Sequence, residues 1–108
     1  MIYCFDIDGT ICDTVDNDYE KSVPRPHFIA RINALFDAGH TIKIFTARGA
    51  TSGKYLRGFT VEQLASWGLK YHELIMGKPN ADVFIDDKAM NIADWDLAIS
   101  NKERRGYP

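Results

Sequence analysis

The sequence predicts one α/β domain, residues 1–108, in which a parallel sheet of about five strands is covered by helices on both faces. Short apolar runs alternate with segments whose apolar residues recur at helical spacing, and this alternation is typical of parallel strands joined by helices. Polar residues follow directly after several of the apolar runs. In parallel sheets this edge, at the carboxyl ends of the strands, is where ligands bind.

The first half of the chain supplies two strands and one helix. Residues 2–5 form a strand buried on both sides, because this apolar run is too short for a helix and has no polar face. Residues 13–26 are polar and acidic and form a loop. The apolar residues of 27–38 recur at helical spacing, and Gly39 ends that helix. Residues 41–45 form the second strand.

The second half continues the alternation. A helix begins at Thr60, where Gln63 occupies the capping-box position, and it ends at Gly68. The remaining expected elements are strands at 74–76 and 82–85, a short helix at 88–95 and a last strand at 97–99.

The first ten residues, MIYCFDIDGT, are the most informative part of the chain. Side chains alternate along a strand, so Asp6 and Asp8 point to the same side, about 7 Å apart. Two carboxylates at the end of a buried strand repel each other and are costly to desolvate, which points to a chemical role. The alternative is a polar turn, since Asp-Gly is a common turn dipeptide.

Further polar residues converge on the same edge. Thr46 ends the second strand, Lys78 follows the third, and Asp86 and Asp87 follow the expected strand 82–85. The four carboxylates can all be ionised only if a cation lies among them. Oxygen ligands without histidine or cysteine favour Mg²⁺ over zinc.

The remaining groups suit a phosphate. Lys78 supplies a positive charge that can neutralise a phosphate or a carboxylate, and Thr46 supplies a hydroxyl donor. A carboxylate nucleophile, a divalent cation, a lysine and a hydroxyl are the groups needed for phosphoryl transfer through an aspartyl phosphate.

These residues resemble the four motifs of the haloacid dehalogenase (HAD) superfamily of phosphohydrolases, which has a Rossmann-like core. The DxDGT motif appears as DIDGT at 6–10, and the Ser or Thr motif as Thr46 in FTAR. The lysine motif is Lys78 in GKP, and the acidic pair is Asp86-Asp87 in VFIDD. The motifs occur in family order over residues 6–87, most of the chain.

The resemblance implies a role for each residue. Asp6 would attack phosphorus, and Asp8 would protonate the leaving oxygen and then activate water. Mg²⁺ would bind the Asp6 carboxylate, the Asp8 carbonyl and the Asp86 carboxylate, with Asp87 orienting the metal shell or the lysine. The phosphoryl group would be held by Thr46, Lys78 and the backbone after the nucleophile and after Thr46: Ile7, Asp8, Gly9 and Ala47. An aspartate at the acid position implies a phosphatase.

Two features bear on the substrate. Arg48 follows Thr46 by two residues and either grips a second anionic group of the substrate or belongs to a solvated loop. Neither segment where relatives insert a cap domain is long enough to hold one. The chain therefore resembles capless members, which include sugar-phosphate phosphatases and phosphatases of nucleic-acid ends or proteins.

The missing cap leads us to expect a homo-oligomer in which a neighbouring subunit covers the site. The alternative is a monomer whose open site takes a large substrate. A small phosphorylated metabolite such as a sugar phosphate is the expected substrate, and a non-catalytic phosphate-binding module is the other functional class.

Composition predicts a folded domain and gives no sign of a nucleic-acid-binding or membrane protein. The formal net charge of −2 gives no bulk electrostatic reason to bind nucleic acid or an anionic membrane. No apolar stretch is long enough to span a bilayer, and no signal-peptide pattern is present. Two cysteines do not make a disulfide framework, so we expect a cytoplasmic protein.

Overall fold

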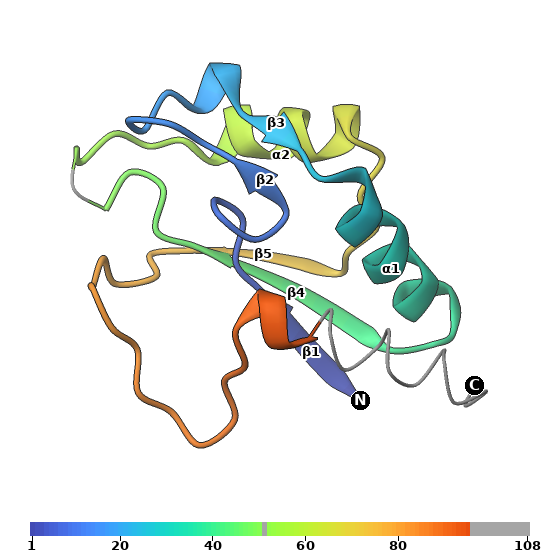
Figure 1. The fold of residues 1–108 in the computed structure, drawn as a ribbon. Coiled ribbons are helices and arrows are strands. Elements are labelled where there is room, and N and C mark those ends of the chain that lie inside the picture. Colours follow the sequence, from blue (N-terminus) through green and yellow to red (C-terminus); the bar gives the residue numbers. More distant parts are fainter. Residues whose placement is uncertain (51, 96–108) are drawn as a thin grey trace.

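A three-stranded parallel sheet forms the centre of the molecule (Figure 1). The computed structural model describes residues 1–50 and 52–95. The strands are β1 (Ile2–Phe5), β4 (Thr41–Thr46) and β5 (Glu73–Met76), in the order β1-β4-β5. Helix α1 (Pro26–Asp37) connects β1 to β4, and helix α2 (Arg57–Ser66) connects β4 to β5. These five elements confirm the predicted alternation over the first three strands.

The core lies on one face of this sheet. Ile42 and Ile44 of the central strand are fully buried, and they align with Tyr3 and Phe5 of β1 in the parallel register. Side chains alternate along a strand, so Lys43 points to the opposite face, where it pairs with Glu73 of β5. The alternation of the central strand thus buries one face of the sheet, whereas the opposite face, which also carries Phe45 and Ile75, is only partly covered.

Helices α1 and α2 both cover the buried face, where Ile32 of α1 and Leu64 of α2 join Ile42 and Ile44 in one core. The Asn33 side chain of α1 donates to the carbonyl of Gly68 and accepts from the amide of Lys70, so α1 lies beside the turn after α2. The expectation of helices on both faces is wrong for the described residues. The two crossovers, β1 to β4 and β4 to β5, step in the same direction along the sheet, and right-handed crossovers of this kind place their helices on the same face. A helix on the opposite face would need a crossover in the other direction, to a strand on the far side of β1.

That reversing strand, predicted at 82–85, does not form. The chain from 77 to 91 is an irregular segment whose apolar side chains are exposed, Ile85 to 96%. Gly77, with a φ of 91°, turns the chain away from the sheet after β5. Segment 82–85 therefore has no hydrogen-bonded neighbour, and an apolar run without a partner is not a strand.

The observed secondary structure also differs from the prediction in the loop at 13–26, at the start of α2 and in the helix expected at 88–95. The loop at 13–26 contains a small antiparallel pair, β2 (Cys12–Asp13) with β3 (Val23–Pro24), and the 3₁₀ helix η1 (Tyr19–Lys21). Helix α2 begins at Arg57, so Thr60 is an interior residue and no capping box forms. Residues 92–95 are helical at the end of the predicted helix 88–95, and the predicted strand 97–99 lies outside the described residues.

Within the part of the chain that the structure describes, no helix is long and apolar enough to cross a membrane.

Replacing Ile44 by alanine should lower the free energy of unfolding by roughly 2–5 kcal/mol, because it opens a cavity in the fully buried centre of the sheet. Lys43→Ala is the control from the same strand, where loss of the exposed Glu73 pair should cost less than about 1 kcal/mol. Urea unfolding measures both. Equal losses would contradict the assignment of the core to one face of β4.

Candidate active site

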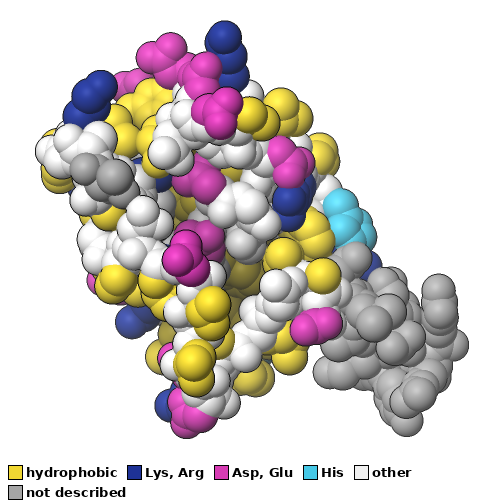
Figure 2. All heavy atoms as spheres, turned by 60° about the vertical axis from the view of Figure 1, so that its left-hand side comes forward, with side chains coloured by type: hydrophobic (Ala, Val, Ile, Leu, Met, Phe, Trp, Pro, Cys, Tyr) yellow, Lys and Arg dark blue, Asp and Glu magenta, His cyan; other side chains and the backbone are white. Residues whose placement is uncertain are grey.

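A cavity of about 950 Å³ lies at the carboxyl ends of the strands. Its wall is formed by the end of β1, the loop around η1, the loop after β4 and the segment after β5. In Figure 2 acidic side chains gather around a hollow on this face. Of the predicted site residues, the described lining includes Asp6, Asp8, Gly9, Ala47, Arg48 and Lys78.

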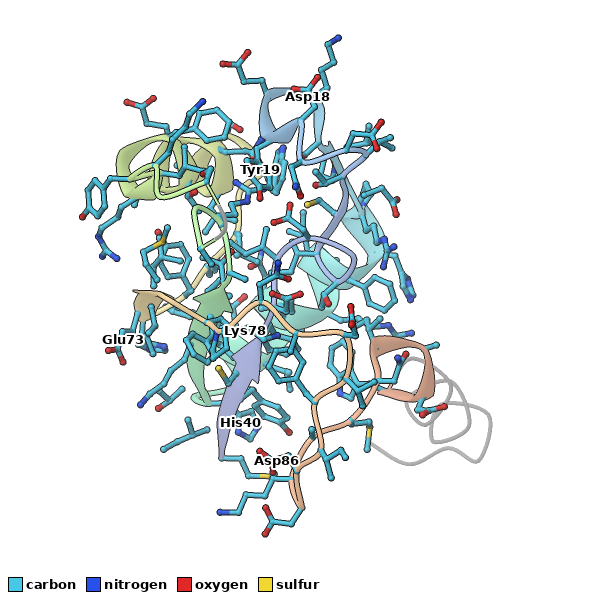
Figure 3. All side chains as sticks on the ribbon, turned by 90° about the vertical axis from the view of Figure 1, so that its left-hand side faces the viewer. Asp18, Tyr19, His40, Glu73, Lys78 and Asp86 are labelled. Carbon is cyan, nitrogen blue, oxygen red and sulfur yellow. The ribbon has the colours of Figure 1, made fainter. Side chains whose placement is uncertain are left out.

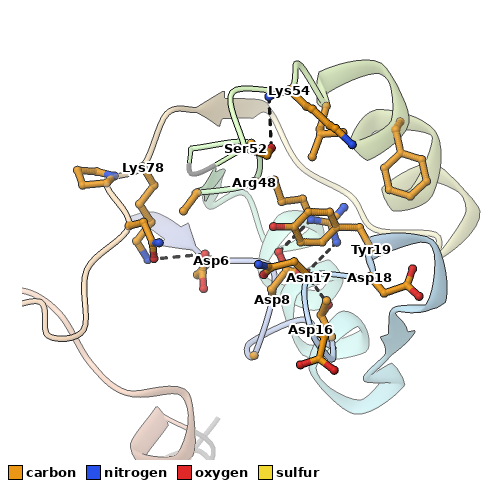
Figure 4. A pocket seen from close by; sticks show the side chains of 18 of the residues that line it. Asp6, Asp8, Asp16, Asn17, Asp18, Tyr19, Arg48, Ser52, Lys54 and Lys78 are labelled. Atoms are coloured by element: carbon orange, nitrogen blue, oxygen red, sulfur yellow. Dashed lines mark hydrogen bonds and ion pairs between the residues drawn. The ribbon is translucent and has the colours of Figure 1, made fainter.

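Asp6 follows β1 directly and faces Lys78 (Figure 4). The Lys78 Nζ lies 3.6 Å from the Asp6 carboxylate. Partial burial raises the pKa of Asp6, while the lysine charge and the backbone amide of Ile7 act in the opposite direction. Asp6 is thus a partly desolvated carboxylate whose charge is balanced by one lysine.

Asp8 has a different environment, two residues along the chain. The Arg48 guanidinium donates to both carboxylate oxygens, with Nε and Nη2 each at 2.9 Å. The Thr14 hydroxyl donates to the same carboxylate at 2.6 Å. Burial alone would raise the pKa of Asp8, but hydrogen bonds from Arg48 and Thr14 outweigh it and hold the pKa below its ordinary value. The two aspartates therefore differ in both partner and pKa.

Thr46 connects the ends of the strands. Its carbonyl accepts the amide of Lys78 at 3.0 Å, which fixes where the chain leaves β5 relative to β4. Its hydroxyl accepts the amide of Arg48 at 3.1 Å, and the side chain is fully buried. Thr46 is not among the described residues that line the cavity.

The backbone after Asp6 makes a tight turn. Gly9 has a φ of 82°, a conformation that favours glycine, and its amide donates to the carbonyl of Cys12 at 2.8 Å. The Ile7 carbonyl accepts the amides of Thr10 and Ile11. The side chain of Ile7 is fully buried, so this residue can reach the cavity only through its backbone.

The predicted acidic pair does not join this group. Asp86 lies on the exposed segment after Lys78, and Figure 3 shows the two well separated. Asp86 accepts the amide of Lys88 at 2.7 Å, a local turn contact. The predicted convergence of Asp86 and Asp87 with Asp6 and Asp8 is not present, because it depended on strand 82–85.

The residues expected to bind Mg²⁺ therefore have suitable ligand atoms, but the structure does not bring them together. The donors are oxygens, as Mg²⁺ prefers, but Asp86 lies on the exposed segment after Lys78, away from Asp6. Among the described residues no group of three or more acidic, histidine or cysteine side chains could hold a metal.

Sequence reasoning missed three residues that organise the site: Thr14, Tyr19 and Gln63. Gln63 was expected to cap a helix. Instead its side chain accepts a hydrogen bond from Arg48 at 2.7 Å and donates one to the Tyr19 carbonyl at 2.6 Å. No local pattern marks such contacts, because the partners are 15 and 44 residues away. Only the position of Arg48 next to Thr46 pointed to this region.

Comparison with known proteins gives a fold but no family assignment. No protein-family model matches the chain, and no curated protein matches it. A crystal structure of a Vibrio cholerae protein superposes with a TM-score of 0.79 at 25% identity, over 87% of this chain and 85% of that one. The chain thus shares its fold with a protein of similar length.

A second solved structure is a D,D-heptose 1.7-bisphosphate phosphatase from B. bronchiseptica, determined with magnesium and phosphate. It superposes with a TM-score of 0.55 at 17% identity, over 95% of this chain and 63% of that one. This likeness concerns the fold alone.

The loop after β4 depends on one glycine contact. Gly49 has a φ of 82°, and a Cβ there would clash with the backbone carbonyl of Lys54. Gly53 has a φ of 71° but open space around it. Gly53→Ala should cost about 1–2 kcal/mol of unfolding free energy for the left-handed backbone, and Gly49→Ala should cost more because the loop must also move.

Chemical unfolding of the two variants checks this prediction. Losses of the same size would show that the approach of Gly49 to Lys54 does not constrain the loop.

Proposed function

We propose that the chain is a phosphomonoesterase that works through an aspartyl phosphate on Asp6. The observation that carries the proposal is the pair of aspartates at the end of β1, one facing Lys78 and the other bound by Arg48, at the wall of a polar cavity. A partly desolvated carboxylate beside one positive charge is suited to nucleophilic attack on phosphorus. The HAD-type core of the second neighbour supports a phosphatase at a coarse level.

In the proposed reaction an Asp6 oxygen attacks phosphorus, and the bond from phosphorus to the leaving oxygen breaks. The leaving oxygen takes a proton from Asp8 or from solvent, and Lys78 offsets the negative charge of the phosphoryl oxygens. Water then attacks the phosphorus of the aspartyl phosphate, with Asp8 taking its proton, and phosphate and the Asp6 carboxylate are released. Thr46 and the backbone of Ile7, Asp8, Gly9 and Ala47 stay the proposed holders of the phosphoryl group.

For the substrate we propose a small sugar phosphate or a similar metabolite. A cavity of about 950 Å³ with polar and charged lining has room for such a molecule. The heptose bisphosphate named for the second neighbour belongs to that class, which makes sugar phosphates the first to test. Phosphorylated nucleic-acid ends or proteins, and a phosphate-binding module without turnover, are the alternatives. Shielding of the cavity by a second subunit also stays a prediction.

Magnesium dependence is part of the proposal. The second neighbour was determined with magnesium, and the proposed ligands here are the Asp6 carboxylate, the Asp8 carbonyl and the Asp86 carboxylate, with Asp87 behind them. Because Asp86 is on an exposed segment away from Asp6, this ligand set requires segment 78–87 to move to the open side of β1.

Asp6→Asn should abolish turnover, at least about a thousandfold, because an amide cannot form the aspartyl phosphate. The measurement is phosphate release from a panel of phosphate esters, with folding checked by circular dichroism. Asp37→Asn is the matched control, since Asp37 pairs with Lys70 on the surface, outside the cavity lining. A folded Asp6→Asn protein with near wild-type activity would exclude Asp6 as the nucleophile.

Activity should require Mg²⁺ and stop in excess chelator, and Mg²⁺ should raise the melting temperature by binding the folded state. Thermal shift and phosphate release at matched ionic strength measure the two effects. Asp86→Asn should weaken both, whereas an unchanged response to Mg²⁺ in that variant would remove Asp86 from the ligand set. Full turnover in chelator would overturn the metal requirement itself.

A further inference from the structure

Arg48 is a buried cation whose contacts go to protein groups. The residue is 3% exposed although it lies at the cavity wall. Its Nε and Nη2 form a two-point contact with the Asp8 carboxylate, the geometry in which arginine fixes a carboxylate most firmly. A single rotation of the Asp8 side chain would break both bonds, so the carboxylate has one preferred orientation.

The guanidinium is itself held from behind by helix α2. Its Nη1 donates to the Gln63 side chain at 2.7 Å and lies 3.4 Å from the Thr60 hydroxyl. Gln63 and Thr60 are one turn apart on α2, so both face the same side. The guanidinium group that binds Asp8 is therefore held in place by side chains of helix α2, although Arg48 itself belongs to the loop after β4.

Arg48 and Gln63 also hold the loop around η1, which forms part of the cavity wall. The Tyr19 ring lies over the guanidinium, with 4.7 Å between the Arg48 Cζ and the ring centroid (Figure 4). The Gln63 side chain donates to the Tyr19 carbonyl at 2.6 Å. Arg48 and Gln63 thus connect three parts of the site: the end of β1, helix α2 and the loop around η1.

We infer that Arg48, anchored by Gln63, is a positioning residue that holds the Asp8 carboxylate for the hydrolysis of the aspartyl phosphate. This inference rests on the proposed function. In that step water forms a bond to phosphorus and the bond from phosphorus to the Asp6 oxygen breaks. One water proton passes to Asp8, and phosphate leaves. The carboxylate must face the attacking water, and the Arg48 fork sets that direction.

This role differs from a grip on a second substrate anion, the function that the sequence position suggested for Arg48. Asp8, Gln63 and Thr60 engage all three guanidinium nitrogens. A substrate anion would have to compete with the Asp8 carboxylate for the same donors. Lys54 lies in the same cavity wall and is exposed, so it is better placed to meet such an anion.

Arg48→Lys tests the inference, because lysine keeps the charge but cannot form the fork. The probe is para-nitrophenyl phosphate in the presence of Mg²⁺, an ester whose good leaving group needs little help in the first step. If Asp8 is misdirected, the second step should slow and the phosphorylated enzyme should accumulate. We expect kcat to fall by about 10- to 100-fold, with a burst of about one nitrophenolate per subunit.

The burst separates positioning from a merely structural role. Loss of folded protein would lower the burst and the steady rate together, whereas slow hydrolysis lowers only the steady rate. Arg57→Lys is the matched control: Arg57 donates to the Leu74 carbonyl and lies outside the cavity lining, so its burst should equal that of the wild type. Gln63→Met should change the burst in the same direction as Arg48→Lys but less strongly.

The outcomes are distinct. A folded Arg48→Lys protein with unchanged kcat, or with a lower kcat and no burst, would overturn the inference while the wild-type turnover upholds the proposed function. If Arg48→Lys does not fold, Gln63→Met decides the question by the same burst. Wild-type protein that releases no phosphate from any ester, with Mg²⁺ present, would overturn the proposed function and this inference together.

Discussion

The contact between Asp8 and Arg48 joins parts of the chain that are 40 residues apart. It fixes the turn after β1 against the loop after β4, and through Gln63 it fixes both against α2 and η1. A partly buried carboxylate and a fully buried guanidinium tolerate this environment only as a pair, since either alone would be left without a partner at a large desolvation cost. The cavity wall therefore depends on one ion pair whose removal would leave several loops unanchored.

The same constraint separates the two aspartates of DIDGT. Both point to the ligand-binding edge and both are partly desolvated, but Asp8 receives a forked contact and Asp6 faces one lysine at 3.6 Å. Their pKa values consequently move in opposite directions, with Asp6 raised and Asp8 lowered. Two like residues one pleat apart thus differ in protonation: burial favours the neutral form of Asp6, whereas Arg48 and Thr14 hold Asp8 as the carboxylate.

The sequence predicted what depends on local pattern. Apolar runs and helical spacing located β1, α1, β4 and β5 to within a residue or so. Because ligands bind at the carboxyl ends of parallel strands, the sequence also placed Asp6, Asp8 and Lys78 around one cavity. Long-range side-chain contacts have no such pattern. Gln63 looked like a helix cap because it follows Thr60 by three residues, whereas its partners come from the loop after β4 and from η1. Arg48 looked available to a substrate because its burial depends on α2, which the local sequence does not specify.

The acidic pair is where local pattern and tertiary arrangement disagree. VFID has the composition of a strand, but a strand needs a neighbour, and the neighbour here would be the side of β1 away from β4. In the described residues that side of β1 has no paired strand, and the apolar side chains of 83–85 face solvent. Pairing these two segments would bury apolar surface and carry Asp86 toward Asp6. The proposed metal site and the pairing of segment 82–85 with β1 therefore depend on each other. A cation bound by both the Asp6 and Asp86 carboxylates would favour the arrangement in which this segment lies beside β1.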